Sequence, residues 1–201
     1  MIIITDTKGR AMKIGRLLVR LIVGGLFIGH GTQKLLGWFG GPGPDGTEQM
    51  MYKIDMHPAR RQAFAAGLTE TAGGALLAAG LATPLAAASL IGVMVTAIRK
   101  VHAENGVWIT RGGYEYNLVL IAALLGLVDG GPGDLSADRA LGIHDTGPAW
   151  ALAALAAGAA ASALVIELGR TPVAQDAASE PDPEAVDEAA SRKEFTAQAS
   201  R

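Results

Sequence analysis

Residues 14–37 read IGRLLVRLIVGGLFIGHGTQKLLG, and this stretch decides the fold class. It is mostly leucine, isoleucine, valine and glycine, and it is long enough to cross a bilayer core, which takes about 20 apolar residues in a helix. Near its end, His30, Gln33 and Lys34 share one helix face, because residues three and four positions apart are neighbours on a helix. A charged side chain in hydrocarbon costs about 3 kcal/mol on insertion scales. The stretch therefore predicts a membrane-spanning helix whose polar stripe faces protein or water.

The composition is that of a membrane protein. Of the 201 residues, 50% are hydrophobic, and the charged residues gather at the N-terminus, in two loops and in the C-terminal tail. The long uncharged runs between them are typical of helices that cross a membrane. The formal net charge of -2 does not favour a nucleic-acid partner, which needs a basic surface. The absence of cysteine excludes disulfides, thiolate catalysis and cysteine-ligated iron–sulfur or zinc sites.

Residues 1–13 are expected to be a short basic leader. Lys8, Arg10 and Lys13 precede the first apolar run and Arg16 lies at its start, as basic residues do in a secretory signal peptide. The run is too long for the apolar core of such a peptide, and the polar stripe takes the place of a small-residue cleavage site. We therefore expect the first helix to be retained as a membrane span.

Further apolar runs follow at residues 63–81, 85–98 and 115–128. Together with the first run they predict an all-α, integral membrane four-helix bundle over residues 14–141. Residues 40–46 (GGPGPDG) formally match a dinucleotide-binding loop, but two prolines remove backbone donors and no strand precedes them, so a turn is predicted. The polar stretch that follows carries scattered methionines and predicts a short interfacial helix.

The C-terminal part divides into an apolar and an acidic segment. Residues 148–168 are dominated by alanine and predict an additional apolar helix, long enough to be a fifth, C-terminal transmembrane helix. Residues 170–201 are alanine, serine, proline, glutamate and aspartate, a composition too polar to bury a core. We expect them to form a disordered acidic tail.

The topology gathers polar residues at one end of the predicted bundle. The chain reverses at each span, so the loop between the first and second spans and the loop between the third and fourth lie on one face of the membrane. The opposite half is expected to hold almost no ionisable side chain. The predicted intramembrane cluster near the shared face comprises His30, Gln33, Lys34, Glu70, Arg99, Lys100, His102, Glu115, Tyr116 and Asn117.

Two pairings are predicted within this cluster. Glu70 lies on a helix face of alanine and glycine, and small residues of this kind let membrane helices pack closely. We expect it to face the bundle and to pair with His30, Lys34 or both, and we expect Glu115 to pair with a base at the end of the third span, Arg99 or Lys100.

The cluster can be interpreted in two ways. Intramembrane ionisable groups often mark functional sites, but charges near helix ends also reach toward the interface, and buried pairs can simply set helix register. His102 could be a metal or haem ligand, although two distant histidines without cysteine form a weak ligand set, and an interfacial position is the better interpretation. No metal ligand and no catalytic residue is assigned.

Several motifs resemble the DoxX family, in matching order and spacing over about residues 15–141. They are Gly24-Gly25, His30-Gly31 and Gln33-Lys34 in the first helix, Glu70 with Gly73-Gly74 in the second, and then Gly112-Gly113-Tyr114-Glu115-Tyr116 and Gly131-Pro132-Gly133. The family is a four-helix membrane family that includes DoxD-like subunits of an archaeal thiosulfate:quinone oxidoreductase. A mycobacterial member is associated with superoxide dismutase and a sulfurtransferase.

The resemblance implies a multi-pass protein of the cell membrane that contacts lipid and associates with other redox proteins or with itself. The first hypothesis for the function of this chain is that it is an anchor or a quinone-facing subunit of a redox complex. Any activity would be that of an oxidoreductase subunit that needs partners, since the chain has no cysteine to handle sulfane sulfur. The alternatives are a structural membrane scaffold and a pathway for a small solute or protons.

Overall fold

A computed structural model describes residues 14–170. The predictions of a basic leader and of a disordered tail from residue 171 onward lie outside these residues. The long helices are α1 (Ile14–Leu36), α3 (Ala59–Ala79), α4 (Thr83–Ala97), α5 (Glu115–Gly130) and α7 (Pro148–Gly169). The shorter elements are α2 (Gly43–Lys53), α6 (Ala137–Ala140), the π turn η2 (Ile98–His102) and the 3-10 turns η1 (Trp38–Gly40), η3 (Ala103–Asn105) and η4 (Ile109–Arg111). No strand occurs within this range, which confirms the all-α prediction.

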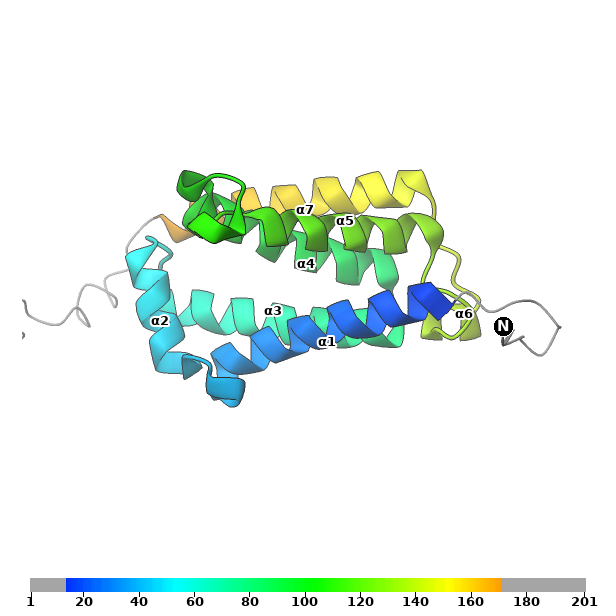
Figure 1. The fold of residues 1–201 in the computed structure, drawn as a ribbon, viewed down its shortest axis with the longest axis horizontal. Coiled ribbons are helices and arrows are strands. Elements are labelled where there is room, and N and C mark those ends of the chain that lie inside the picture. Colours follow the sequence, from blue (N-terminus) through cyan, green and yellow to red (C-terminus); the bar gives the residue numbers. More distant parts are fainter. Residues whose placement is uncertain (1–13, 171–201) are drawn as a thin grey trace, which may run out of the picture. The chain divides into compact units, whose positions relative to one another are not determined.

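The long helices form two groups (Figure 1). α1 packs along α3, whereas α4, α5 and α7 pack on one another, and α3 and α4 join the groups. α1 touches α5 only slightly. The loops that contain α2 and η2–η4 lie at the same end of the bundle, and α6 lies at the other end (Figure 1). The two long loops therefore share one face, as the alternation of spans predicted.

One short element begins earlier than the sequence indicated. α2 starts at Gly43, inside the segment predicted to be only a turn, and Pro44 lies in its first turn. Proline is well tolerated there, because the first backbone N–H groups of a helix have no partner within the helix. A short helix was therefore predicted correctly, but it was placed too late in the chain.

Three helices are long and apolar enough to cross a membrane within the described range: α1, the segment Thr83–Asn105 that continues α4 through η2 and η3, and α7. α5 has only 16 residues, and α3 is less apolar because alanine, glycine and threonine replace leucine. α3 packs along α1, and α5 packs along α4. The chain is thus an all-α membrane protein.

Glycines bring α1 and α3 into close contact. A Cβ added to Gly24 would lie 2.7 Å from the carbonyl oxygen of Gly74 and 2.9 Å from the Cβ of Ala78. Such close backbone approach is how membrane helices gain packing contacts that lipid tails cannot offer. The neighbouring Gly25 has nothing within 4 Å of the same position.

This contrast makes a matched pair of variants. Gly24→Ala is expected to lower the free energy of unfolding by about 1 to 3 kcal/mol, because the added methyl group forces the two helices apart. Gly25→Ala is expected to leave stability unchanged or raise it by up to about 1 kcal/mol, because alanine is the better helix former. Thermal unfolding in detergent, followed by tryptophan fluorescence, checks both, and equal effects would show that the helices are not in contact at Gly24.

α7 is an integral part of the bundle. Its buried residues are small and recur every three or four positions against α4: Ala151, Ala154, Gly158 and Ser162. Thr96 of α4 donates a hydrogen bond to Ser162 at 2.9 Å. Near the loop end, Ile166 joins a second apolar cluster with residues of α2 and α3. The alanine-rich helix predicted as an addition therefore packs against α4 and α5 within the bundle.

The end of the bundle opposite α2 contains a buried arginine. Arg20 of α1 is 3% exposed, and its guanidinium donates hydrogen bonds to three carbonyl oxygens: Ala78 at 2.9 Å, Pro132 at 2.6 Å and Leu135 at 2.5 Å. One side chain thus joins α1, the last turn of α3 and the loop that follows α5.

Asp138 completes this end. It is 3% exposed and accepts hydrogen bonds from the backbone N–H of Ala82 at 2.7 Å and from the hydroxyl of Thr83 at 2.6 Å, at the start of α4. The prediction that this half holds almost no ionisable side chain was wrong. Its charged groups can be buried because backbone carbonyl and N–H groups at the helix ends satisfy them.

Candidate functional site

An ion pair between α1 and α3 lies at the loop end of the bundle. The Nζ of Lys34 is 2.6 Å from the Oε2 of Glu70, and the two side chains are 18% and 4% exposed. Lys34 also donates to the carbonyl oxygen of His30, one turn earlier, at 3.4 Å. The predicted pairing of Glu70 with Lys34 is confirmed. Such a buried pair costs desolvation energy that apolar residues would not, so it is weak evidence for a purely stabilising role.

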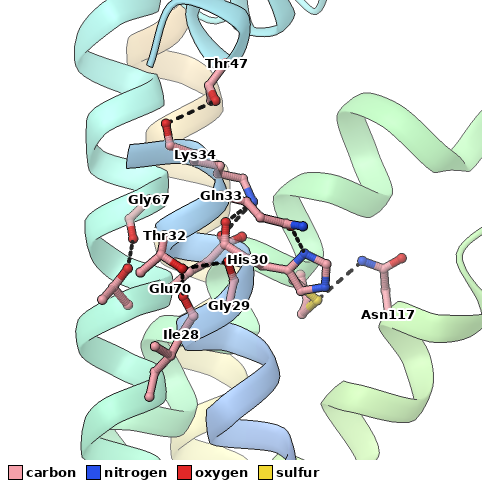
Figure 2. Close-up of polar contacts among 12 residues, drawn as sticks. Ile28, Gly29, His30, Thr32, Gln33, Lys34, Thr47, Gly67, Glu70 and Asn117 are labelled. Carbon is pink, nitrogen blue, oxygen red and sulfur yellow. Dashed lines mark hydrogen bonds and ion pairs between the residues drawn. The ribbon is translucent and has the colours of Figure 1, made fainter. Parts of the chain in front are cut away.

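His30 lies beside this pair on the exposed surface of α1. Its Nδ1 is 3.1 Å from the Oε1 of Gln33, one turn further along the helix. Among the described residues, Glu70 has its direct contact with Lys34 and not with His30. The imidazole is nevertheless close enough to act electrostatically on the Glu70 carboxylate. We call His30, Gln33, Lys34 and Glu70 the polar cluster (Figure 2).

The polar cluster begins where the apolar core ends. Phe27 on α1, Leu90 on α4 and Leu120 on α5 are at most 5% exposed and belong to one core. One turn closer to the loop end, α1 carries His30, α4 carries Met94 and α5 carries Asn117.

The side chains of Met94 and Asn117 contact each other. On α4 the next turn carries Met94, and on α5 it carries Asn117, whose amide nitrogen donates to the Met94 sulfur at 3.4 Å. In Figure 2 the His30 ring and the Asn117 carboxamide point toward one another from α1 and α5. Met94 was not singled out from the sequence, because a methionine in an apolar helix is ordinarily a core residue.

A small cavity of about 80 Å³ lies on the other side of Lys34, between α1, α2 and α3. It is lined by Leu35, Pro44, Ala63, Phe64 and the side chains of Lys34 and Arg60. Arg60 is exposed and pairs with Glu48 at 2.8 Å, so the mouth of this cavity carries both signs of charge. The cavity brings solvent-accessible space up to the stem of Lys34.

Residues 15–103 match the family model DoxX. The chain therefore carries a DoxX domain over this segment. No curated protein and no solved structure matches it. The matched segment contains the whole polar cluster, on α1 and α3, and it ends in η3, so that α5 and α7 follow the matched part of the DoxX chain.

The other predicted residues lie at the same end of this DoxX protein but outside the polar cluster. The carboxylate of Glu115 accepts a hydrogen bond from the backbone N–H of Ile109 at 3.1 Å. Its predicted pairing with Arg99 or Lys100 is wrong, because the loop before α5 folds back and supplies a backbone donor first. Both bases lie in η2 and form no ion pair within residues 14–170.

His102 and Tyr116 are likewise separate from the polar cluster. The Nδ1 of His102 is 2.7 Å from the carbonyl oxygen of Gly112, within the same loop, and Tyr116 is 39% exposed. Within the described part of the chain, no three His, Asp or Glu side chains come together as metal ligands.

Proposed function

We propose that this DoxX protein is a multi-pass subunit of the plasma membrane that binds a quinone and works with partner redox proteins. The observation that carries the proposal is an exposed histidine directly beside a buried lysine–glutamate pair, at the loop end of the apolar core. A quinone head group needs hydrogen-bond donors or acceptors inside an apolar site, and the polar cluster offers both.

The residues of the polar cluster fit a quinone. His30 and Gln33 offer a donor and an acceptor, and behind them the Lys34–Glu70 pair holds an ammonium and a carboxylate. Ile22 and Leu26 precede His30 at four-residue spacing and are 60% and 41% exposed. This stripe forms an apolar path from lipid to His30 along which an isoprenoid tail could lie.

A bound quinone supplies the capacity to take up two electrons and two protons as it becomes a quinol. The electrons would come from a partner redox protein, since the chain has no cysteine for sulfur redox chemistry. The role of this chain is to bind and orient the head group and to hold protons. His30 is the group placed to exchange a proton with the ligand, and the Lys34–Glu70 pair lies behind it.

Binding of decylubiquinone to the purified protein in mild detergent tests the proposal. We expect saturable quenching of tryptophan fluorescence, and we expect His30→Leu to weaken it about tenfold by removing a hydrogen-bonding group. His102→Leu is the matched control, because His102 lies in η2 and bonds only within its own loop. Absence of binding to the unmodified protein would refute the proposal.

A structural scaffold is the main alternative, and the same experiment separates it, because a scaffold binds its partners without binding quinone. A proton or solute pathway is not favoured. Phe27, Leu77, Leu90 and Leu124 are at most 2% exposed and belong to the core between the polar cluster and the Arg20 end.

A further inference from the structure

Asn117 is a buried amide with an incomplete set of hydrogen bonds. It is 6% exposed, and its only side-chain hydrogen bond within the described residues is to the sulfur of Met94, a weak acceptor. Its carboxamide oxygen accepts none from residues 14–170. Every fully enclosed side-chain oxygen or nitrogen in this range has a partner, so the Asn117 oxygen must reach accessible space. A buried amide left in this state costs free energy that a ligand could recover.

In Figure 2 the amide nitrogen of Asn117 lies on the side of His30, and the amide oxygen lies on the opposite side. Figure 2 shows the Asn117 carboxamide and the His30 ring pointing toward one another. The two helices touch only slightly, and His30 is exposed. Below both residues lies the apolar core of Phe27 and Leu120. Two polar groups on different helices thus point toward one another at the loop end of the apolar core.

We infer that Asn117 and His30 bind the two opposite oxygens of one quinone ring between α1 and α5. This rests on the proposed function and adds a second binding residue and a direction of access. An amide both donates and accepts, so Asn117 can pair with a quinone carbonyl through its N–H and with a quinol hydroxyl through its oxygen. The thioether of Met94, held by the same amide, lies where it can contact the ring. The tail leaves between α1 and α5 into the lipid.

Infrared spectroscopy of bound, 13C-carbonyl-labelled decylubiquinone tests this inference. In the unmodified protein both carbonyl stretches should shift to lower frequency, because each oxygen accepts a hydrogen bond. Asn117→Leu should restore one stretch to its free value and His30→Leu the other, and each variant should weaken binding about tenfold. Tyr116→Phe, on the exposed face of α5, is the matched control and should change neither stretch.

The outcomes separate the inference from the proposed function. If the quinone binds but only one carbonyl is shifted, or if Asn117→Leu leaves both stretches and the affinity unchanged, Asn117 and His30 do not bind the two oxygens of one ring, and the proposed function stands. If no quinone binds to the unmodified protein, both fail. Should Asn117→Leu not fold, the two stretches of the unmodified protein, compared with those of His30→Leu, still decide whether a second residue bonds the ring.

Discussion

Lys34→Met is expected to lower the free energy of unfolding by about 3 to 5 kcal/mol, because it leaves the Glu70 carboxylate buried without its cation. Glu70 is 3% exposed, and Lys34 is the only side chain in the described range that forms an ion pair with it. Removing one member of a buried pair is far more destabilising than removing both, since the remaining charge keeps its desolvation cost. Unfolding in detergent, followed by tryptophan fluorescence, measures the loss.

The double variant Lys34→Met/Glu70→Gln tests whether the unpaired charge is the cause of this loss. It removes both charges and keeps the size of the acidic side chain, so most of the lost stability should return. Lys53→Met, an exposed lysine at the end of α2, should have little effect. A single variant as stable as the unmodified protein would mean that water reaches Glu70 freely, and the buried ion pair would then play no part in folding.

Arg20→Met should destabilise the bundle by a similar amount, about 3 to 5 kcal/mol, through a different contact. The arginine donates to carbonyl groups of Ala78, Pro132 and Leu135, and hydrogen bonds that involve a charged group contribute about 1.5 to 3 kcal/mol each, though not additively. Electrostatic attraction to Asp138 adds to them. Thermal unfolding measures the loss, and limited proteolysis should find new cleavage in residues 131–147.

Arg20→Lys should rescue little, because an ammonium cannot reproduce the fixed fork of donors that a guanidinium presents to three carbonyls. Arg60→Met supplies the control on an exposed arginine, whose ion pairs lie in solvent, and should leave stability nearly unchanged. Equal stability of Arg20→Met and Arg60→Met would contradict the role of Arg20 in joining α1 to the loop after α5.

The helices of this protein could be predicted because long apolar runs, and the polar residues that end them, are local properties of the sequence. The first run was placed at residues 14–37 and α1 covers Ile14–Leu36. Errors arose where a local motif is compatible with two structures. Pro44 is as suitable in the first turn of a helix as in a loop, so the start of α2 was missed.

The candidate site could be predicted only in part. The polar stripe on α1 and the position of Glu70 on a small-residue face follow from helical periodicity. Which base pairs with Glu70 depends on the length of the side chain that must extend from α1 to α3. The longer side chain of Lys34, and not that of His30, contacts the Glu70 carboxylate. Glu115 was assigned a basic partner, but a backbone N–H in its own loop is nearer. Arg20 was not singled out, because its acceptors come from segments far apart in sequence.

The sequence by itself determined that this chain is an all-α membrane protein with a DoxX domain. The length and hydropathy of the apolar runs and the spacing of the motif residues are properties of the linear sequence. Only the tertiary structure decided which charges meet, that α7 packs against α4, and that His30 and Asn117 face one another. Those facts depend on helix rotation and on contacts between residues distant in sequence, which no local pattern encodes.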